Sequence, residues 1–329
     1  MRENAAYVIG LDGGGTKTTA QLADLNGRVA LETQGGPSNF QTLGVEEVAK
    51  SILDLVETCC RTVGCNISEI GSVVAGLAGA GRTIDQQRIA EGIQSAAQSR
   101  GIYLRDLKIE SDARIALESA FLGNPGIVLI CGTGSIAFAK TRSGKILRAG
   151  GWGRVIGDEG SGYQIGRDAL RAVTKAIDGR GKKTRMVKMV SSSFGLKHHE
   201  DIVRSVYRDN LDLATVAPFV VRAAQQGDAV AKEILNASAQ ELLETVRAVL
   251  KGMKTKRRAM RVEISIVLIG GLMESDNWYS RKVKSLIRKS LPDIIVRKPV
   301  GQPVQGAVLI AVERAKAGPT TEKNAAAFA

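Results

Sequence analysis

Histidine is nearly absent from this chain of 329 residues, which contains only His198 and His199. Two adjacent histidines leave a Ser-His-Asp triad or a histidine-based zinc site little to work with. If the protein catalyses a reaction that needs a general base, the sequence therefore predicts that a carboxylate supplies it.

Cysteine is also scarce, and its four copies do not form the pattern of a disulfide framework. Cys59 and Cys60 are adjacent, Cys65 lies close by, and Cys131 falls inside an apolar run. We expect reduced thiols and a cytoplasmic protein, because the first residues show no secretory leader pattern. A redox role for Cys59 and Cys60 stays open.

Long apolar runs and abundant aromatic residues are both missing. No apolar run approaches the length that crosses a bilayer, and aromatic residues make up only 4% of the chain, too few for a platform that stacks single-stranded bases. The net charge is +13, with basic runs at 180–185, 251–261 and 281–289. Such runs are typical of solvated surface, so we expect no membrane and no specific nucleic-acid partner. The role of the basic surface stays open.

Glycine, in contrast, is abundant, and three glycines follow an aspartate near the start of the chain. An apolar run ends in Asp12, and Gly13, Gly14 and Gly15 precede Thr16, Lys17 and Thr18. Three glycines let the backbone fold closely against a bulky group and point N–H groups at an anion, and an aspartate at a strand end can hold a hydrated Mg²⁺. These features suit the terminal phosphates of a nucleotide, whereas a hairpin alone would need one glycine.

This loop differs from a Walker A motif because Thr16 stands between the glycines and Lys17. The residues after Thr16 favour a strand, and Asn26-Gly27 favours a hairpin turn. The sequence therefore predicts a phosphate loop between two antiparallel strands.

The same arrangement recurs about 120 residues later. The apolar run 126–131 leads into Gly132, Thr133, Gly134 and Ser135, and a second strand follows at 136–140. Two further apolar runs, 71–75 and 262–269, also end in glycines, the latter in Gly270 and Gly271. This recurrence predicts two related halves, each with a glycine loop at its first hairpin.

Strands alternate with helices along both halves. Apolar periodicity predicts helices at 46–63, 84–99, 113–121, 163–177, 228–251, 278–290 and 305–317, with strands between them. This alternation indicates an α/β protein with two domains and a cleft between them. We expect domains over 1–117 and 118–318, and a disordered tail over 319–329.

At this point the chain resembles the N-acetylglucosamine kinase branch of the actin-like ATPase superfamily, which is grouped with the BadF/BadG-type ATPases. The resemblance spans roughly residues 7–315 and is carried by four motifs: Gly10-x-Asp12-Gly13-Gly14-Gly15-Thr16, Ser111-Asp112-Ala113, Gly132-Thr133-Gly134-Ser135, and Gly150-Gly151-Trp152-Gly153 followed by Gly157-Asp158-Glu159-Gly160-Ser161. It implies a duplicated, ribonuclease H-like fold with a nucleotide and sugar cleft between the domains.

The resemblance implies a nucleotide site built from glycine loops. Asp12 would position Mg²⁺ through water. The groups around the phosphates of ATP would be Gly13, Gly14, Gly15, Thr16, Lys17, Gly132, Thr133, Gly134 and Ser135, and Gly270 and Gly271 would leave room on the adenosine side.

Asp112 is the candidate catalytic base. It follows an apolar strand and precedes a helix, and the matching aspartate in the resembling kinases accepts the proton of the attacking sugar hydroxyl. The alternative is that Asp112 only caps the helix that begins at Ala113.

The resemblance also implies substrate-binding residues, namely Asn39, Asp112, Gly151, Trp152 and Asp158. Three of these residues also have a purely structural interpretation. Asn39 suits a turn, Trp152 suits core packing, and Asp158 lies where negative charge favours a following helix.

The predicted reaction is in-line phosphorylation of an amino sugar at its 6-hydroxyl, with ATP and Mg²⁺ and without a phospho-enzyme. The alternative is an ATPase activator of a 2-hydroxyacyl-CoA dehydratase or benzoyl-CoA reductase, which would need cysteines at a dimer interface for an iron–sulfur cluster. The identity of the amino sugar stays open, and a homodimer is possible.

Overall fold

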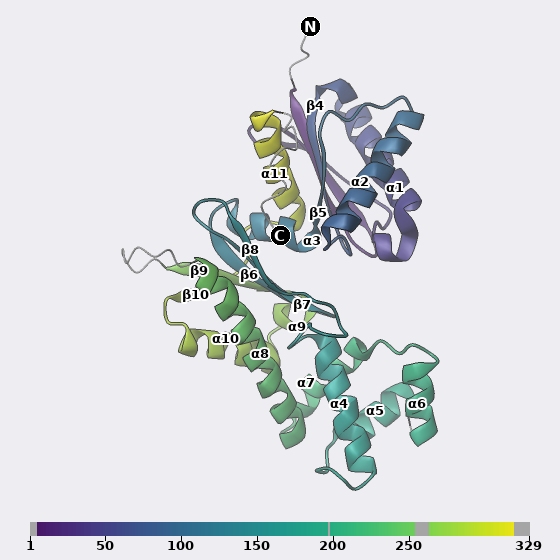
Figure 1. The fold of residues 1–329 in the computed structure, drawn as a ribbon, viewed down its shortest axis with the longest axis vertical. Helices are drawn as coiled ribbons and strands as arrows, with labels where there is room; N and C mark the ends of the chain where they lie inside the picture. The colour runs from purple at the N-terminus through teal and green to yellow at the C-terminus, as the bar shows by residue number, and fades with distance from the viewer. Residues whose placement is uncertain (1–4, 197, 254–262, 319–329) are drawn as a thin grey trace. The chain divides into compact units, whose positions relative to one another are not determined.

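The computed structural model describes residues 5–196, 198–253 and 263–318. The chain divides into two compact units, one made of Met1–Asn124 with Pro299–Ala329 and the other of Pro125–Lys298. Figure 1 traces the course of the chain through its elements. The predicted tail at 319–329 and part of the basic run at 251–261 lie outside the described residues.

The first unit is built on a mixed sheet of five strands. Its strands are β1 (Tyr7–Gly13), β2 (Thr18–Asp24), β3 (Val29–Gly35), β4 (Ile70–Leu77) and β5 (Leu107–Ser111), in the spatial order β3-β2-β1-β4-β5. The first three form an antiparallel meander, and β4 and β5 run parallel to β1. The predicted hairpin after the triple glycine is thus confirmed.

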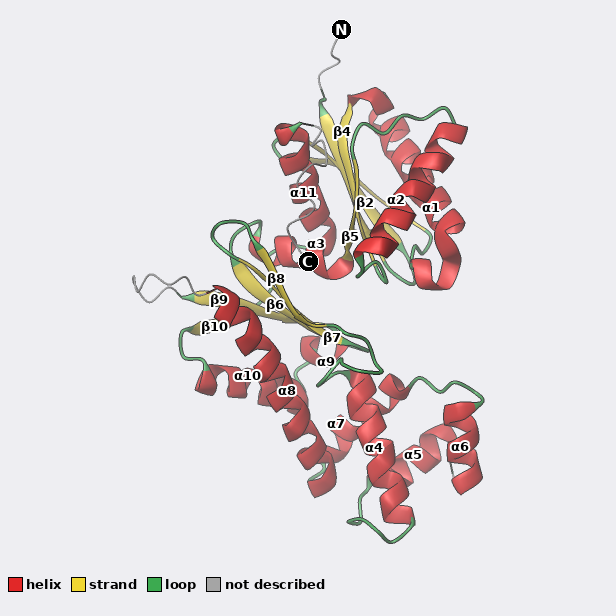
Figure 2. Ribbon diagram, in the orientation of Figure 1, coloured by secondary structure: helices red, strands yellow, loops and turns green. Residues whose placement is uncertain are grey.

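Helices cover both faces of this sheet, as Figure 2 shows. Ile9 and Leu11 of β1 belong to the core under α1 (Phe40–Val63) and α2 (Thr83–Ser99), whereas Val8 packs with residues of α3 (Asp112–Phe121) and α11 (Pro303–Ala317). This division follows from the alternation of side chains along a strand.

Two glycines allow α11 to pack closely inside the first unit. A Cβ on Gly10 of β1 would run into Val308 of α11, and a Cβ on Gly306 of α11 would run into the backbone of Ile115 in α3. The absence of a side chain at these two glycines therefore lets α11 pack closely against β1 and α3.

The second unit repeats the sheet. Its strands are β6 (Gly126–Cys131), β7 (Ser135–Lys140), β8 (Ile146–Gly150), β9 (Ile264–Ile269) and β10 (Ile294–Arg297), in the order β10-β9-β6-β7-β8. Again the first three strands are antiparallel, and the last two are parallel to the first. The predicted duplication is confirmed at the level of strand order.

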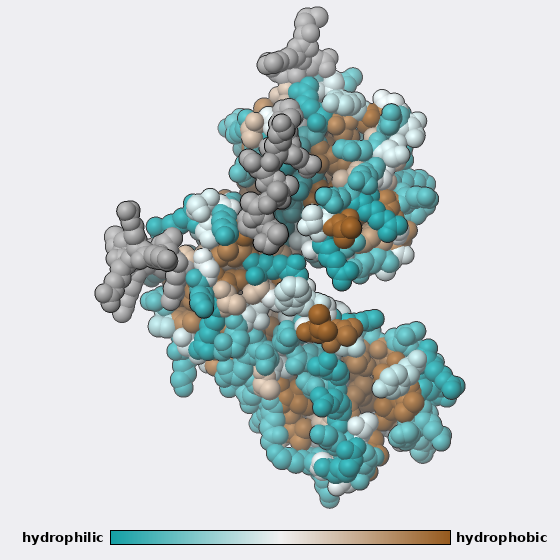
Figure 3. All heavy atoms as spheres, in the orientation of Figure 1, coloured by the Kyte–Doolittle hydropathy of each residue, from teal (hydrophilic) through white to brown (hydrophobic). Residues whose placement is uncertain are grey.

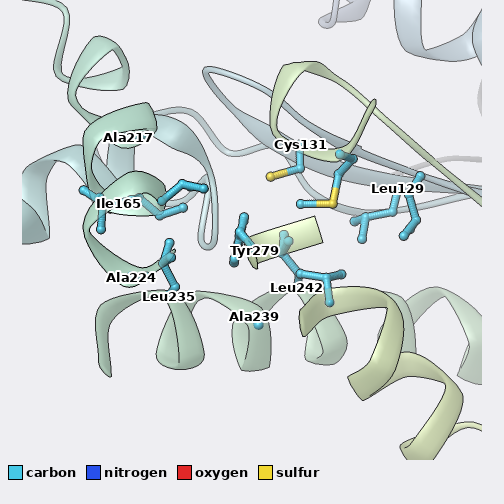
Figure 4. Close-up of a cluster of buried hydrophobic side chains, with 14 of the residues drawn as sticks. Leu129, Cys131, Ile165, Ala217, Ala224, Leu235, Ala239, Leu242 and Tyr279 are labelled. Carbon is cyan, nitrogen blue, oxygen red and sulfur yellow. The ribbon is translucent and has the colours of Figure 1, made fainter. Parts of the chain in front are cut away.

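The helices of this unit form a large core on the sheet. They are α4 (Gly162–Ile177), α5 (Met186–Phe194), α6 (His199–Tyr207), α7 (Ala217–Gln225), α8 (Ala229–Met253), α9 (Gly271–Glu274) and α10 (Trp278–Ser290), with a short 3₁₀ turn at Leu213–Val216. The first unit has a similar turn at Ile67–Glu69. Figure 4 shows part of the core, where Leu129 and Cys131 of β6 lie with Tyr279 and Leu242. Tyr279 is fully buried.

The structure differs from the sequence prediction in three places. The domain boundary lies after Asn124 rather than after residue 117, because the chain of α3 stays within the first unit. The helix α11, expected in the second domain, belongs to the first, because it packs on α3 and β1. The elements α5, α6, α7, α9 and β10 were not predicted, since they are short.

Hydrophilic residues cover most of the face shown in Figure 3, with brown apolar patches between them. Among the residues that the structure describes, no helix combines the length and the apolar character that a membrane span requires.

Candidate active site

The first glycine loop joins β1 to β2 and is held by backbone hydrogen bonds. Within the loop, the N–H of Gly14 donates to the carbonyl of Lys17 at 3.0 Å. From outside it, the N–H of Ser38 donates to Gly14 at 3.0 Å, and that of Ala78 donates to Gly13 at 2.8 Å. Two segments of the same unit therefore fix the shape of the loop.

The three glycines of this loop are needed for different reasons. A Cβ on Gly13 would run into the hydroxyl of Ser38, so the fold itself requires this glycine. A Cβ on Gly14 would meet its nearest atom only at 3.5 Å, one on Gly15 would meet nothing within 4 Å, and neither residue has a positive φ. The fold does not need these two glycines, and their bare backbone leaves room for a ligand.

Asp12 lies in β1 just before the loop and is half-buried. The pKa of its carboxyl is raised to about 6, first by burial and then by the neighbouring charge of Asp112, while Lys17 opposes the shift. The structure thus brings Asp12 and Asp112 close enough for their charges to interact. Two such carboxylates repel each other, and a bound cation would relieve that repulsion.

Asp112 is the first residue of α3, and the cap of that helix is Ser111. The hydroxyl of Ser111 accepts a hydrogen bond from the N–H of Arg114 at 3.1 Å, so the capping role considered for Asp112 belongs to its neighbour. Oδ1 of Asp112 accepts from the N–H of Ala113 at 2.8 Å. The side chain keeps contact with solvent, yet desolvation by the surrounding protein raises the pKa of its carboxyl, and the backbone hydrogen bonds only partly offset this.

The second glycine loop joins β6 to β7 and is tied to the start of α4. The N–H of Gly162 donates to Gly132 at 2.8 Å, and that of Tyr163 donates to Thr133 at 3.1 Å. A Cβ on Gly132 would meet nothing within 4 Å. As in the first loop, the fold leaves the space beside a glycine open.

Asp158 lies directly beside this second loop. Its carboxylate accepts hydrogen bonds from the N–H groups of Ser135 and Gly153, and a Cβ on Gly134 would lie only 2.9 Å from its Oδ2. Burial raises the pKa of Asp158, the charge of Glu159 adds to this, and the hydrogen bonds oppose it. The structure therefore brings Asp158 together with Gly134 and Ser135.

Trp152 is 69% exposed, so the alternative that it packs in the core is wrong. The guanidinium of Arg148 lies 5.8 Å from the centroid of its ring. Val155 and Ile156 of the same loop are exposed as well, at 82% and 76%. Three large apolar side chains at one loop are typical of a surface that covers a ligand or a partner.

Asn39 does serve the structural role that its alternative describes. It is the N-cap of α1, and its Oδ1 accepts from the N–H of Gln41 at 3.1 Å. Its amide nitrogen has no hydrogen-bond acceptor among the described residues. A capped helix start thus fixes the amide and leaves its donor group for a ligand.

Gly270 is required by the fold and Gly271 is not, a difference also found among the glycines of the first loop. Gly270 has φ +99° and lies against the backbone of Cys131, so the fold requires it. A Cβ on Gly271 would meet nothing within 4 Å. Only Gly271 therefore leaves open space, and the expected adenosine-side role stays a prediction.

The four cysteines are mostly buried. Cys59, Cys60 and Cys131 are buried, and Cys65 is half-buried. Burial raises the pKa of the Cys59 thiol to about 11 and that of Cys131 to about 12. In the described part of the chain, no group of three or more histidine, cysteine, aspartate and glutamate side chains is arranged to hold a metal ion.

Two supporting residues were missed in the sequence. Ser38 braces the first loop through its N–H, and its hydroxyl also accepts a hydrogen bond from Thr18 at 2.7 Å. Tyr279 donates a hydrogen bond to Gly160, near Asp158. A signal existed for Ser38, which directly precedes the candidate Asn39, whereas Tyr279 lies 119 residues from its partner.

The chain is similar to several known proteins along most of its length. Residues 9–311 match the model of the BadF/BadG/BcrA/BcrD ATPase family. The chain is 33% identical over 308 residues to an N-acetylmuramic acid/N-acetylglucosamine kinase of Clostridium acetobutylicum, covering 93% of this chain and 98% of that one. It is 30% identical over 320 residues to an N-acetyl-D-glucosamine kinase of Dictyostelium discoideum, covering 94% and 98%.

A solved structure also resembles this one along its length. It is a putative N-acetylglucosamine kinase from Chromobacterium violaceum, with 25% identity, a TM-score of 0.69, and coverage of 93% of this chain and 99% of that chain.

Proposed function

Because the chain belongs to the BadF/BadG/BcrA/BcrD ATPase family, we propose that it is a sugar kinase that transfers the γ-phosphoryl group of ATP to the 6-hydroxyl of an amino sugar. The observation that carries this proposal is Asp112. It is a solvent-accessible carboxyl at the start of a helix that another residue caps, in a chain whose relatives bear the names of amino-sugar kinases.

Asp112 is the general base of this reaction. Its carboxylate accepts the proton of the sugar hydroxyl as the oxygen–phosphorus bond forms, and ADP leaves on the opposite side. The raised pKa of Asp112 makes its carboxylate a stronger base than an ordinary exposed aspartate. No covalent intermediate on the protein is needed.

The nucleotide phosphates are bound by backbone N–H groups of the two glycine loops. Gly14, Gly15 and Gly132 support this role, because their missing side chains leave space that the fold does not use. Thr16 and Lys17 are exposed at the first loop and add a hydroxyl and a positive charge. Gly271 supplies a further open position for the adenosine side.

Asp12 fits a role in holding Mg²⁺ through water. Its pKa is raised by burial and by the charge of Asp112, so a nearby cation favours the charged form of both carboxylates. When bound, the ion neutralises charge on the phosphates.

Asp158, Trp152, Gly151 and Asn39 bind the sugar. Asp158 is held beside the second glycine loop and offers carboxylate oxygens to sugar hydroxyls. Trp152 presents an exposed ring, and Asn39 offers the amide donor that its cap leaves unused. The exposed Val155 and Ile156 suit the apolar part of an acetamido group.

The cysteines give no support to the ATPase-activator alternative. A bridging iron–sulfur cluster needs thiolates at an accessible surface, and three of the four cysteines are buried. The thiol of Cys131 also donates a hydrogen bond to Gly160 inside the core.

An ADP-release assay tests the proposal. The enzyme with ATP-Mg is measured against N-acetylglucosamine, N-acetylmuramic acid, glucosamine, N-acetylmannosamine and glucose, and without sugar. We expect an amino sugar to stimulate ADP release strongly, and the 6-deoxy form of the same sugar to give none. ATP turnover that no sugar changes would overturn the sugar-kinase proposal, and equal turnover of the 6-deoxy sugar would overturn the 6-hydroxyl assignment.

A further inference from the structure

The peptide groups of Gly160 are held by three buried or half-buried side chains from three elements. Its carbonyl accepts a hydrogen bond from the hydroxyl of Tyr279 in α10 at 2.7 Å and one from the thiol of Cys131 at the end of β6 at 3.3 Å. Its N–H donates to Oε1 of Gln164 in α4 at 2.7 Å. These three side chains satisfy both polar groups of the buried backbone at Gly160.

Packing alone does not explain the hydroxyl of Tyr279. The side chain is fully buried among apolar residues, where phenylalanine would fill nearly the same volume without a polar atom. Burial also raises its pKa well above the usual value, so the hydroxyl stays protonated and remains a donor. The hydroxyl donates its hydrogen bond to the carbonyl of Gly160.

Gly160 and Asp158 both have a left-handed backbone conformation. Gly160 has φ +78°, and a Cβ there would run into Leu242 and the backbone of Ser238. Two residues earlier, Asp158 has φ +57°, which is unfavourable for a residue with a side chain. Such a conformation persists only where its surroundings impose it.

Hydrogen bonds hold each residue of the 158–160 segment in this conformation. The carboxylate of Asp158 accepts from Ser135 and Gly153, the carbonyl of Glu159 accepts from the hydroxyl of Ser135 at 2.7 Å, and Gly160 is held as described. The 158–160 segment is therefore held by Ser135 of the second glycine loop and by Tyr279 of α10.

We propose that Tyr279 is a positioning residue for the sugar-binding carboxylate of Asp158, acting through the carbonyl of Gly160. The inference rests on the proposed function, because it takes Asp158 to bind the sugar. Tyr279 itself touches no substrate. Its hydroxyl fixes the peptide that sets the direction of the 158–160 segment, and the thiol of Cys131 joins the same carbonyl to the strand that leads into the second glycine loop.

The test is Tyr279→Phe, which removes one oxygen atom. We expect the KM for the amino sugar to rise about tenfold, while kcat and the KM for ATP stay within twofold of the wild type, since a misplaced Asp158 weakens sugar binding first. The matched control is Tyr207→Phe, the same change at a side chain that is 80% exposed. An unchanged sugar KM in Tyr279→Phe would overturn the inference, and so would an equal loss in every kinetic constant together with a lower Tm, because that pattern reports only a damaged core.

A double-mutant cycle tests whether Tyr279 acts through Asp158. In the Asp158→Asn background, Tyr279→Phe should change the sugar KM by less than twofold, because the carboxylate that it positions is already gone. Independent, multiplying effects of the two changes would contradict the inference.

Amide hydrogen exchange separates failure of the inference from failure of the proposed function. Tyr279→Phe should speed exchange in peptides that cover 151–164 and leave peptides of 7–35 unchanged, whether or not any sugar is a substrate. If wild-type protein phosphorylates no sugar but this exchange pattern holds, the proposed function fails while the positioning role of Tyr279 stands. Unchanged exchange at 151–164 overturns the positioning role.

Discussion

The two units share one sheet topology but differ in the charges that it presents. Asp12 and Cys131 both stand directly before a glycine loop at the end of the first strand of their unit. In the first unit that position is a half-buried carboxyl whose pKa is about 6, and in the second it is a buried thiol whose pKa is about 12. A duplicated fold thus keeps the loop in both halves and places the titratable carboxyl in one.

The residues that follow β5 in the first unit and β10 in the second unit also differ in charge. In the first unit β5 leads directly into Asp112, whereas in the second β10 leads through Lys298, Pro299, Val300, Gly301 and Gln302 to α11, without an acidic residue. The second unit instead carries Asp158 in a loop after its third strand. Under the proposed function, the acid–base carboxyl of Asp112 therefore lies in the first unit, whereas both units supply residues that bind ligands.

Removing the carboxylate of Asp112 should have the largest effect. We expect Asp112→Asn to lower kcat by roughly a hundredfold to ten-thousandfold, the range for loss of a general base, with little change in ATP binding. Steady-state kinetics and nucleotide titration measure the two effects. The matched control is Asp85→Asn, which removes an acidic residue from the first turn of α2 in the same unit. Near-normal turnover in Asp112→Asn would end the role of Asp112 as base.

The dependence of kcat/KM on pH at acid pH also tests the role of Asp112 as the general base. The base must be deprotonated, so kcat/KM should fall as pH falls through a pKa above the usual value of about 3.9, because desolvation by the surrounding protein raises the pKa of Asp112. This acid limb should be lost in Asp112→Asn. A limb that is the same in both proteins would mean that another group titrates.

The helix α11 follows the second unit in the chain but belongs to the first unit. One ion pair ties it to that unit. Arg314 of α11 forms two hydrogen bonds, at 2.6 and 2.8 Å, to the carboxylate of Asp106, which also accepts from Ser72 at 2.6 Å. We expect Arg314→Met to lower the free energy of unfolding by about 1–3 kcal/mol, because the change removes charge-assisted hydrogen bonds from a partly buried carboxylate. Urea unfolding measures it.

The pH dependence of this pair has a definite sign. Burial tends to raise the pKa of Asp106, but the hydrogen bonds from Arg314 and Ser72 outweigh it and hold the pKa below its usual value. The stabilisation is therefore present above about pH 4 and is lost as pH falls through the lowered pKa of the folded protein. The stability difference between the wild type and Asp106→Asn should shrink in that range, and a constant difference would contradict the ion-pair explanation.

The two glycine loops can be compared by adding one methyl group to each. Gly15→Ala and Gly132→Ala should fold normally, since a Cβ at either position meets nothing within 4 Å, yet both should raise the KM for ATP about tenfold, or about 1.4 kcal/mol. Gly134→Ala should raise the sugar KM instead, because its Cβ would push on Asp158. Thermal unfolding and kinetics with each substrate varied distinguish these outcomes. Unchanged ATP kinetics in Gly15→Ala and Gly132→Ala would show that the open space is not used by nucleotide.

The sequence predicted the parts of the site that depend on local pattern. The glycine loops, the strand pairs around them and the position of Asp112 at a helix start could be identified, because turn glycines and apolar periodicity act over a few residues. The role of Trp152 could not be decided, since its exposure depends on the course of the whole loop. The packing of α11 in the first unit could not be predicted, because Gly10 and Gly306 indicate a close contact only once the helix or strand that faces each glycine is known.

The smallest predicted effect compares the helix caps of the two units. Ser111 and Ser161 each accept a hydrogen bond from the N–H three residues on, at 3.1 and 3.3 Å.

Substitution of either serine by alanine should cost about 1 kcal/mol, because one helix-terminal N–H loses its acceptor. In α4 the first amides remain bonded to Gly132 and Thr133, so Ser161→Ala should leave the second glycine loop in place and the KM for ATP unchanged. In α3 the cap directly precedes Asp112, so Ser111→Ala should also lower kcat slightly. Urea unfolding gives the stability cost of each change, and equal effects of the two changes on kcat would contradict the placement of the acid–base carboxyl in the first unit.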